Sequence, residues 1–200
     1  MLKHRTQKMS KIAFDFEMDF HPKDDWGLLA LLKGFQLFRQ GRRRRISNIL
    51  QRKDDFLELE TYIFDYRFVR GRSKHRTTFN QTVFFIQSKK LGLPEFLMKP
   101  ENFFHRIGEF LGMQDIDFVE FPEFSNRYLL QGSDEDYIRA TMTDEVLKYF
   151  SVEKNWSLEG VNYYLIFYQK RKLIPPHQIR HFYQKGMEIY KMLITDPPGL

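Results

Sequence analysis

Two histidines near the C-terminus have a spacing that suits metal binding. His177 and His181 stand four residues apart in a segment that predicts a helix, so both imidazoles share one helix face, as two zinc ligands do. Gln178 holds the position of the glutamate in the H-E-x-x-H motif, and no third ligand can be identified. A surface pair of histidines is therefore the favoured interpretation, and no metal site is predicted.

Carboxylates recur in the segment 115–121, which reads DIDFVEF. The alternation predicts a strand, and Asp115 and Asp117 would point to the same side of it. Such a pair could bind a metal ion or serve as a general acid and base. A metal site needs further ligands that the sequence does not identify, so a polar strand face is the favoured interpretation.

Other titratable residues support an enzyme only weakly. Asp65, His75 or the histidine pair are the groups that an enzyme of unknown reaction would use, but such groups need a pocket that a sequence cannot show. The chain has no cysteine, and it contains no P-loop, dinucleotide fingerprint or G-x-S-x-G motif. We predict no catalytic residue and no cofactor, and an enzyme remains an alternative.

Arginine and lysine are concentrated in two short segments, GRRRR at 41–45 and RGRSKHR at 70–76. The segments 46–50, 56–68 and 77–87 have strand character and predict a three-stranded antiparallel meander. Because the chain reverses at each turn, the loop before the first strand and the loop after the second lie at the same end of the sheet. The predicted anion-binding rim therefore comprises Arg42, Arg43, Arg44, Arg45, Arg70, Arg72, Lys74 and Arg76. The alternative is that both segments are exposed loops that keep the sheet edges soluble.

The composition indicates a folded, basic protein of one domain. The 200 residues are 42% hydrophobic with 21 phenylalanines, and the formal net charge is +6. A basic protein tends to meet phosphates of nucleic acid or anionic lipid. Without cysteine a reducing cytosol is the default, and the most apolar window, residues 26–35, is shorter than the roughly 20 residues that span a bilayer. We expect a cytoplasmic protein that could lie peripherally on the inner membrane face.

The N-terminal residues 1–38 form a predicted extension. Residues 1–11 are polar and expected to fray, the alternation from Ala13 to Phe20 predicts a short strand, and His21–Pro22 is expected to end it. Asp24 or Asp25 then begins a predicted amphipathic helix that runs to about Phe38.

Residues 39–194 are predicted to form a single α+β domain, and 195–200 a tail. After the meander we expect a short strand at 96–98, a helix at 101–111, the strand at 115–121, and helices that begin near Ser133 and at Thr143. A hairpin at 156–173 and a final helix that begins at Pro175–Pro176 complete the chain. The predicted fold class is α+β, an antiparallel sheet of a meander plus a C-terminal hairpin, covered by three or four helices.

Four sequence segments carry a resemblance. They are IFDY at 63–66, QTV at 81–83, LPEF with KPE at 93–101, and FSNRYLLQGSDEDYIRATMT at 124–143. Their order resembles a group of uncharacterised bacterial proteins with a domain of unknown function, whose relatives often carry a membrane anchor ahead of it. The resemblance implies no activity, and a membrane role for this chain would be peripheral.

The expected function is a non-enzymatic binding or scaffold module, whose basic rim meets an anionic membrane surface or an acidic protein. Nucleic-acid binding is the first alternative, because Tyr62, Tyr66 and Phe68 could stack on bases beside the arginines. No RNP, OB or helix-turn-helix signature supports it. The oligomeric state is not indicated by the sequence.

Overall fold

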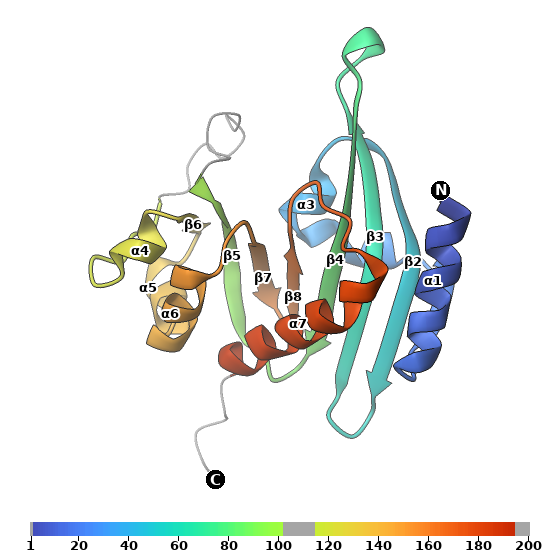
Figure 1. The fold of residues 1–200 in the computed structure, drawn as a ribbon. Coiled ribbons are helices and arrows are strands. Elements are labelled where there is room, and N and C mark those ends of the chain that lie inside the picture. Colours follow the sequence, from blue (N-terminus) through green and yellow to red (C-terminus); the bar gives the residue numbers. More distant parts are fainter. Residues whose placement is uncertain (1, 102–114, 195–200) are drawn as a thin grey trace.

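The computed structural model describes residues 2–101 and 115–194. Within them, eight antiparallel strands form one sheet in the order β1-β2-β3-β4-β8-β7-β5-β6, shown in Figure 1. The strands are β1 (Asp19–Lys23), β2 (Arg42–Asp54), β3 (Leu59–Arg70), β4 (Thr77–Ser88), β5 (Leu93–Pro100), β6 (Tyr128–Gly132), β7 (Ser157–Asn162) and β8 (Tyr164–Tyr168). The α+β class and the large antiparallel sheet are thereby confirmed.

Helices lie on both faces of the sheet. They are α1 (Leu2–Asp15), α2 (Leu28–Leu31), η1 (Leu32–Gly34), α3 (Gln36–Arg39), η2 (Ser73–His75), α4 (Pro122–Ser125), α5 (Glu135–Thr141), α6 (Asp144–Val152), η4 (Pro176–Gln178) and α7 (Ile179–Leu193). One face packs against α1, α5, α6 and α7, and the other against residues 28–39, which we call the α2–α3 segment. Side chains alternate between the faces, so that Ile63 enters the first core and Phe64 the second.

The meander is confirmed, since β2 pairs with β3 and β3 with β4, both antiparallel. The expected loop before the first strand is wrong, because β2 begins at Arg42 and the arginine run belongs to the strand. Arg45 pairs with Arg67, and the irregular register between Arg42 and Arg45 accommodates Arg43 with φ 52°. Backbone pairing to a long neighbouring strand extends β2 through residues whose side chains signalled a loop.

The N-terminal expectations are wrong in their element types. Residues 2–15 form α1 instead of a frayed tail and the start of a strand, because Met9 and Ala13, four residues apart, are fully buried against the sheet. The strand β1 begins at Asp19 and contains His21–Pro22. Proline is tolerated there because β1 is the edge strand of the sheet.

The helix expected up to Phe38 is divided into α2, η1 and α3. Both carboxylate oxygens of Asp24 accept hydrogen bonds from the backbone N–H groups of residues 27–29, at 2.8 to 2.9 Å, and so begin it. Phe35 has φ −81° and ψ 144°, an extended conformation that interrupts the helix before α3.

The C-terminal half contains one wrong strand and several correct elements. Residues 115–121 form only a single bridge, Asp115 to Gln131, so the strand expected there, with its polar face, is wrong. The helix expected at 101–111 lies outside the described residues. Helix α6 begins after Thr143 as predicted, whereas α5 is capped by Asp134. The hairpin β7–β8 and the final helix α7 are confirmed.

Candidate anion-binding site

The two basic segments lie side by side at one end of the sheet. Arg42 pairs with Val69 at the start of β2, and its guanidinium Nη2 donates a 2.6 Å hydrogen bond to the carbonyl of Gly71. The β3–β4 loop that carries Arg72, Lys74 and Arg76 extends the same end of the sheet, as Figure 1 shows. The two segments of the basic rim, defined by the eight residues named above, therefore lie at the same end of the sheet, as the meander predicted.

The members of the basic rim differ in what they contact. Arg44 turns back onto the chain, where its Nη2 donates to the carbonyl of Arg39 at 2.7 Å. Arg45 stands opposite Arg67, a cross-strand pair of like charges. Arg42, Arg70 and Arg72 line a cavity instead.

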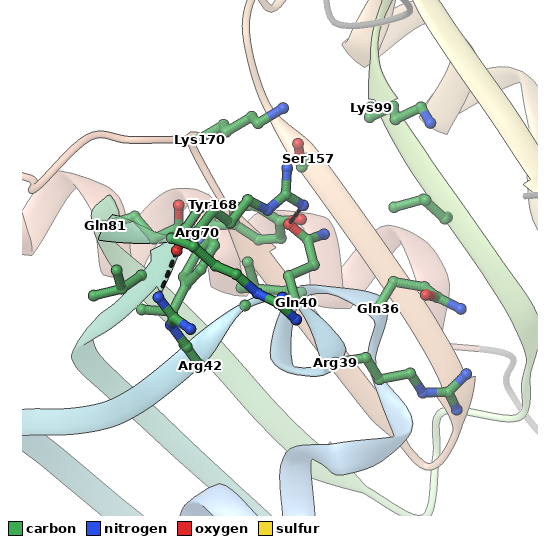
Figure 2. A pocket seen from close by; sticks show the side chains of 17 residues that line it. Gln36, Arg39, Gln40, Arg42, Arg70, Gln81, Lys99, Ser157, Tyr168 and Lys170 are labelled. Atoms are coloured by element: carbon green, nitrogen blue, oxygen red, sulfur yellow. Dashed lines mark hydrogen bonds between the residues drawn. The ribbon is translucent and has the colours of Figure 1, made fainter. Parts of the chain in front are cut away.

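This cavity, which we call the α3 cavity, has a volume of about 620 Å³ and lies between the α2–α3 segment and the ends of β3, β4, β5, β7 and β8. Figure 2 shows Lys170 and Ser157 on the side opposite to Gln40 and Arg42. Six basic residues line it: Arg39, Arg42, Arg70, Arg72, Lys99 and Lys170. Among the described residues no aspartate or glutamate lines it. The α3 cavity is therefore a concave site with a strong positive charge.

Arg70 is held in place at the wall of the α3 cavity. Its Nη2 donates a 2.5 Å hydrogen bond to Oε1 of Gln40, seen in Figure 2. Its guanidinium lies 5.8 Å from the ring of Phe68 and 5.6 Å from that of Phe79, two rings that stack on each other. A preorganised guanidinium loses little conformational entropy when an anion binds.

A buried carboxylate anchors the α2–α3 segment. The side chain of Glu159 accepts hydrogen bonds from the backbone N–H of Gln36 at 2.6 Å, the backbone N–H of Leu37 at 3.1 Å and the hydroxyl of Tyr168 at 2.9 Å. Burial away from water raises its pKa to about 7, against the opposing effect of these hydrogen bonds. Glu159 thus fixes one wall of the α3 cavity and is not itself part of the lining.

Two further polar residues of the lining are almost fully buried. Gln81 has no exposed surface, and its Oε1 accepts a hydrogen bond from the backbone N–H of Arg171 at 3.1 Å. Its Nε2 has no hydrogen-bond partner among the described residues. Lys99 is 8% exposed, and burial lowers the pKa of its ammonium, although the nearby Asp115, Glu101 and Glu159 oppose that shift.

Asp65, which was considered for chemistry, has a structural role. Its two carboxylate oxygens accept hydrogen bonds from Nε and Nη2 of Arg5 at 2.6 and 2.7 Å. Thr82 and Asn48 donate to the same carboxylate. The network ties α1 to the face of the sheet.

The three histidines considered for chemistry lie at the surface. His75 is in the exposed β3–β4 loop, and His177 and His181 are exposed near the start of α7. Across the described residues, no group of three or more His, Cys, Asp or Glu side chains is arranged to hold a metal ion.

The aromatic residues considered for base stacking are in the core. Tyr62, Tyr66 and Phe68 are 5%, 0% and 2% exposed, so they offer no face to a nucleobase.

The sequence prediction missed the part of the site that the C-terminal half contributes. The hairpin β7–β8 inserts between β4 and β5, which brings Lys170 and Ser157 to the same end of the sheet as Arg70. The run 170–172 was a visible signal, but its place depends on the order of the strands.

A solved structure with a similar fold was found. The crystal structure of the mycobacterial trehalose monomycolate transport factor A, TtfA, superposes with a TM-score of 0.64 over 97% of this chain and 98% of that chain. The two sequences are 10% identical, so the likeness shows a common fold alone. No family model and no curated protein matches this chain by sequence. Within the described residues no helix is both long and apolar enough to cross a membrane.

Proposed function

We propose that this protein is a non-enzymatic binding module that docks through its basic rim onto an anionic membrane surface. The observation that carries the proposal is the convergence of three separate basic segments, 42–45, 70–76 and 170–172, at one end of the sheet. The chain has no aspartate or glutamate in residues 26–53, 66–94 or 160–187, which contain these segments. These three stretches of the chain therefore add no negative charge of their own to this end of the sheet.

The magnitude of the attraction is sufficient for reversible docking. Each Lys or Arg near an anionic lipid surface contributes about 1 kcal/mol, and the effect falls off within a Debye length of about 8 Å at physiological salt. A rim of several exposed arginines and lysines would therefore bind with a strong dependence on salt. We place such docking at the inner face of the membrane, in the cytoplasm.

The fold likeness supports a binding role rather than an enzymatic one. The structure with the same fold is named as a transport factor. A role in transport is consistent with a module that holds an anionic surface or ligand without transforming it. Kinship with the group of uncharacterised bacterial proteins remains a prediction.

Vesicle co-sedimentation tests the proposal. The protein is mixed with vesicles of phosphatidylcholine alone or with phosphatidylglycerol added, across a salt series. The rim variant replaces residues that do not line the α3 cavity: Arg43→Gln, Arg45→Gln, Lys74→Gln and Arg76→Gln. The matched control removes the same charge from the opposite end of the sheet: Arg52→Gln, Lys53→Gln, Lys89→Gln and Lys90→Gln.

We expect salt-sensitive binding to the anionic vesicles that the rim variant loses and the control variant keeps. Equal losses in both variants, or no binding at low salt, would overturn the proposal. Single-stranded RNA and an acidic peptide are included as competitors. If either competitor releases the protein from the vesicles at a concentration below that of the anionic lipid, that class of partner replaces the membrane.

A further inference from the structure

We infer that the α3 cavity binds the phosphate monoester group of an organic ligand. This inference rests on the proposed function, because Arg42, Arg70 and Arg72 belong both to the basic rim and to the cavity lining. It adds a defined ligand class to what is otherwise a charged surface. The argument depends on the charge of the cavity, its polar lining and its size.

The charge of the lining favours a dianion. Arg42 of β2, Arg70 of β3 and Arg72 of the loop after β3 line the cavity together with Lys170. Figure 2 shows Lys170 on the side opposite to Arg42. The planar guanidinium presents paired N–H donors that match the oxygens of a phosphate. A phosphate monoester carries a charge between −1.5 and −2 near neutral pH and offers three strong acceptor oxygens. A carboxylate would use fewer of these donors.

Part of this constellation is already oriented without a ligand. Gln40 and the stacked rings of Phe68 and Phe79 hold Arg70, while the carbonyl of Gly71 holds Arg42. Glu159 fixes the backbone of Gln36 and Leu37 at the adjoining wall. A site whose donors are fixed beforehand gains affinity because less side-chain entropy is lost on binding.

A buried donor in the wall independently indicates an acceptor ligand. Gln81 is fully buried in the lining, and its Nε2 has no partner among the described residues. The amide orientation is fixed, since Oε1 accepts from the backbone N–H of Arg171. An unsatisfied buried donor is costly, and native proteins rarely retain one without a ligand or water to meet it.

The cavity is larger than the space that a phosphate ion alone would fill. A volume of about 620 Å³ is in the range of pockets that hold organic ligands, and far larger than one phosphate. Ser157, Gln36 and Gln40 can hydrogen-bond to hydroxyl groups, and Leu37 and Leu97 add apolar side chains to the lining. The ligand is therefore a phosphate monoester with an organic body, either a soluble molecule or the headgroup of a lipid such as phosphatidic acid.

The test uses soluble probes and vesicles in parallel. Isothermal titration calorimetry measures the binding of inorganic phosphate, glycerol 3-phosphate and glycerol to the full chain at pH 7.5 and pH 5.5. Vesicles with phosphatidic acid, which ends in a phosphate monoester, are compared with vesicles of equal surface charge made with phosphatidylglycerol, a diester.

We expect glycerol 3-phosphate to bind more tightly than inorganic phosphate, and glycerol not to bind. Affinity should fall at pH 5.5 because the second proton of the phosphate returns with a pKa of about 6. A preference for phosphatidic acid vesicles over phosphatidylglycerol vesicles assigns the lipid as the source. Binding of glycerol 3-phosphate without that preference assigns a soluble ligand.

Two cavity variants are compared with the rim variant and the control variant defined above. Arg70→Gln should weaken glycerol 3-phosphate binding at least tenfold. Because Arg70 also contacts Gln40 and the aromatic rings, the second variant, Arg72→Gln with Lys170→Gln, removes two other charges of the lining. Thermal unfolding shows that each variant is folded. The rim variant should retain the binding of glycerol 3-phosphate.

The outcomes separate this inference from the proposed function. Loss of phosphatidylglycerol binding in the rim variant, with no heat of binding for any phosphate probe, would overturn the cavity assignment and leave membrane docking intact. If glycerol 3-phosphate binds tightly, both cavity variants lose that binding and no vesicles are bound, the cavity assignment is supported and membrane docking is overturned. Unchanged phosphate binding in both cavity variants would also overturn the inference.

Discussion

The carboxylate of Glu159 accepts a 2.6 Å hydrogen bond from the backbone N–H of Gln36, although 123 residues separate them in the chain. The contact joins β7 to the first residue of α3. It shows how the α2–α3 segment, with only four residues in each of its α-helices, keeps its position on the sheet. Short helices are unstable alone, so such a tether has to be supplied by the fold.

Removal of this tether should destabilise the protein. In Glu159→Ala, the N–H groups of Gln36 and Leu37 and the hydroxyl of Tyr168 lose their acceptor inside the core. We expect the free energy of unfolding to fall by about 2–4 kcal/mol, measured by urea denaturation. Glu120→Ala, which alters an exposed glutamate, is the control and should change stability by less than about 0.5 kcal/mol.

The same residue predicts how stability depends on pH. The pKa of Glu159 is about 7 in the folded protein, raised from 4.5 by burial. The pKa of Glu159 is higher in the folded protein than in the unfolded chain, so the folded state binds the proton more tightly. The stabilisation that comes from this bound proton is lost as pH rises from 4.5 through 7.

Comparison with Glu159→Gln isolates this effect from the titration of groups elsewhere in the chain. Relative to the variant, the wild-type protein should lose stability between about pH 5 and pH 8. A difference in the free energy of unfolding that stays constant across this range would contradict the raised pKa.

The attachment of α1 should depend on one ion pair. Arg5→Met leaves the carboxylate of Asp65, 7% exposed, without its cationic partner. Loss of one member of a buried pair costs about 3–5 kcal/mol, and we expect a loss of that order in urea denaturation. Lys8→Met changes an exposed position on the same helix and serves as the control. The double variant Arg5→Met with Asp65→Asn should recover part of the loss.

The turn that leads into β2 should require glycine. Gly41 has φ +64°, and a Cβ there would lie 2.7 Å from both the carbonyl oxygen of Val69 and the ring of Phe68. Gly41→Ala should therefore lower the free energy of unfolding by about 2 kcal/mol or more, from left-handed strain and overlap together. Gly34→Ala is the matched control, since nothing lies within 4 Å of its Cβ, and it should be neutral or slightly stabilising. Equal losses in the free energy of unfolding for Gly41→Ala and Gly34→Ala would contradict a special requirement for glycine at position 41.

Local sequence patterns were sufficient to predict the central strands and the last helix. The enrichment of 56–68 and 77–87 in aromatic and β-branched residues predicted β3 and β4, and the period of Ile179, Phe182 and Ile189 predicted α7. The two strands are covered on both faces and bury nearly all their side chains along most of their length, so they stand out by composition. Helix α7 buries one face, which leaves a period of 3.6 in the sequence. Antiparallel reversal then placed the arginines of 42–45 near those of 70–76.

The N-terminus shows where local pattern was insufficient. The alternation of Phe14, Phe16, Met18 and Phe20 favoured a strand, yet Phe14 ends up 84% exposed near the end of a helix. The helix forms because Met9 and Ala13 reach the core and Arg5 reaches Asp65, a partner 60 residues away. Contacts with distant residues override local preference, and a single sequence does not reveal such contacts.

The sequence by itself determined the class of the fold, the basic character of the chain and the neighbourhood of its two arginine runs. The tertiary structure decided that a cavity exists there and what lines it. Insertion of β8 and β7 between β4 and β5 brings Lys170, Ser157 and Lys99 to the arginines, and Glu159 holds α3 against them. Strand order and burial depend on pairing between distant segments, whose free energy is a property of the whole sheet rather than of any local stretch.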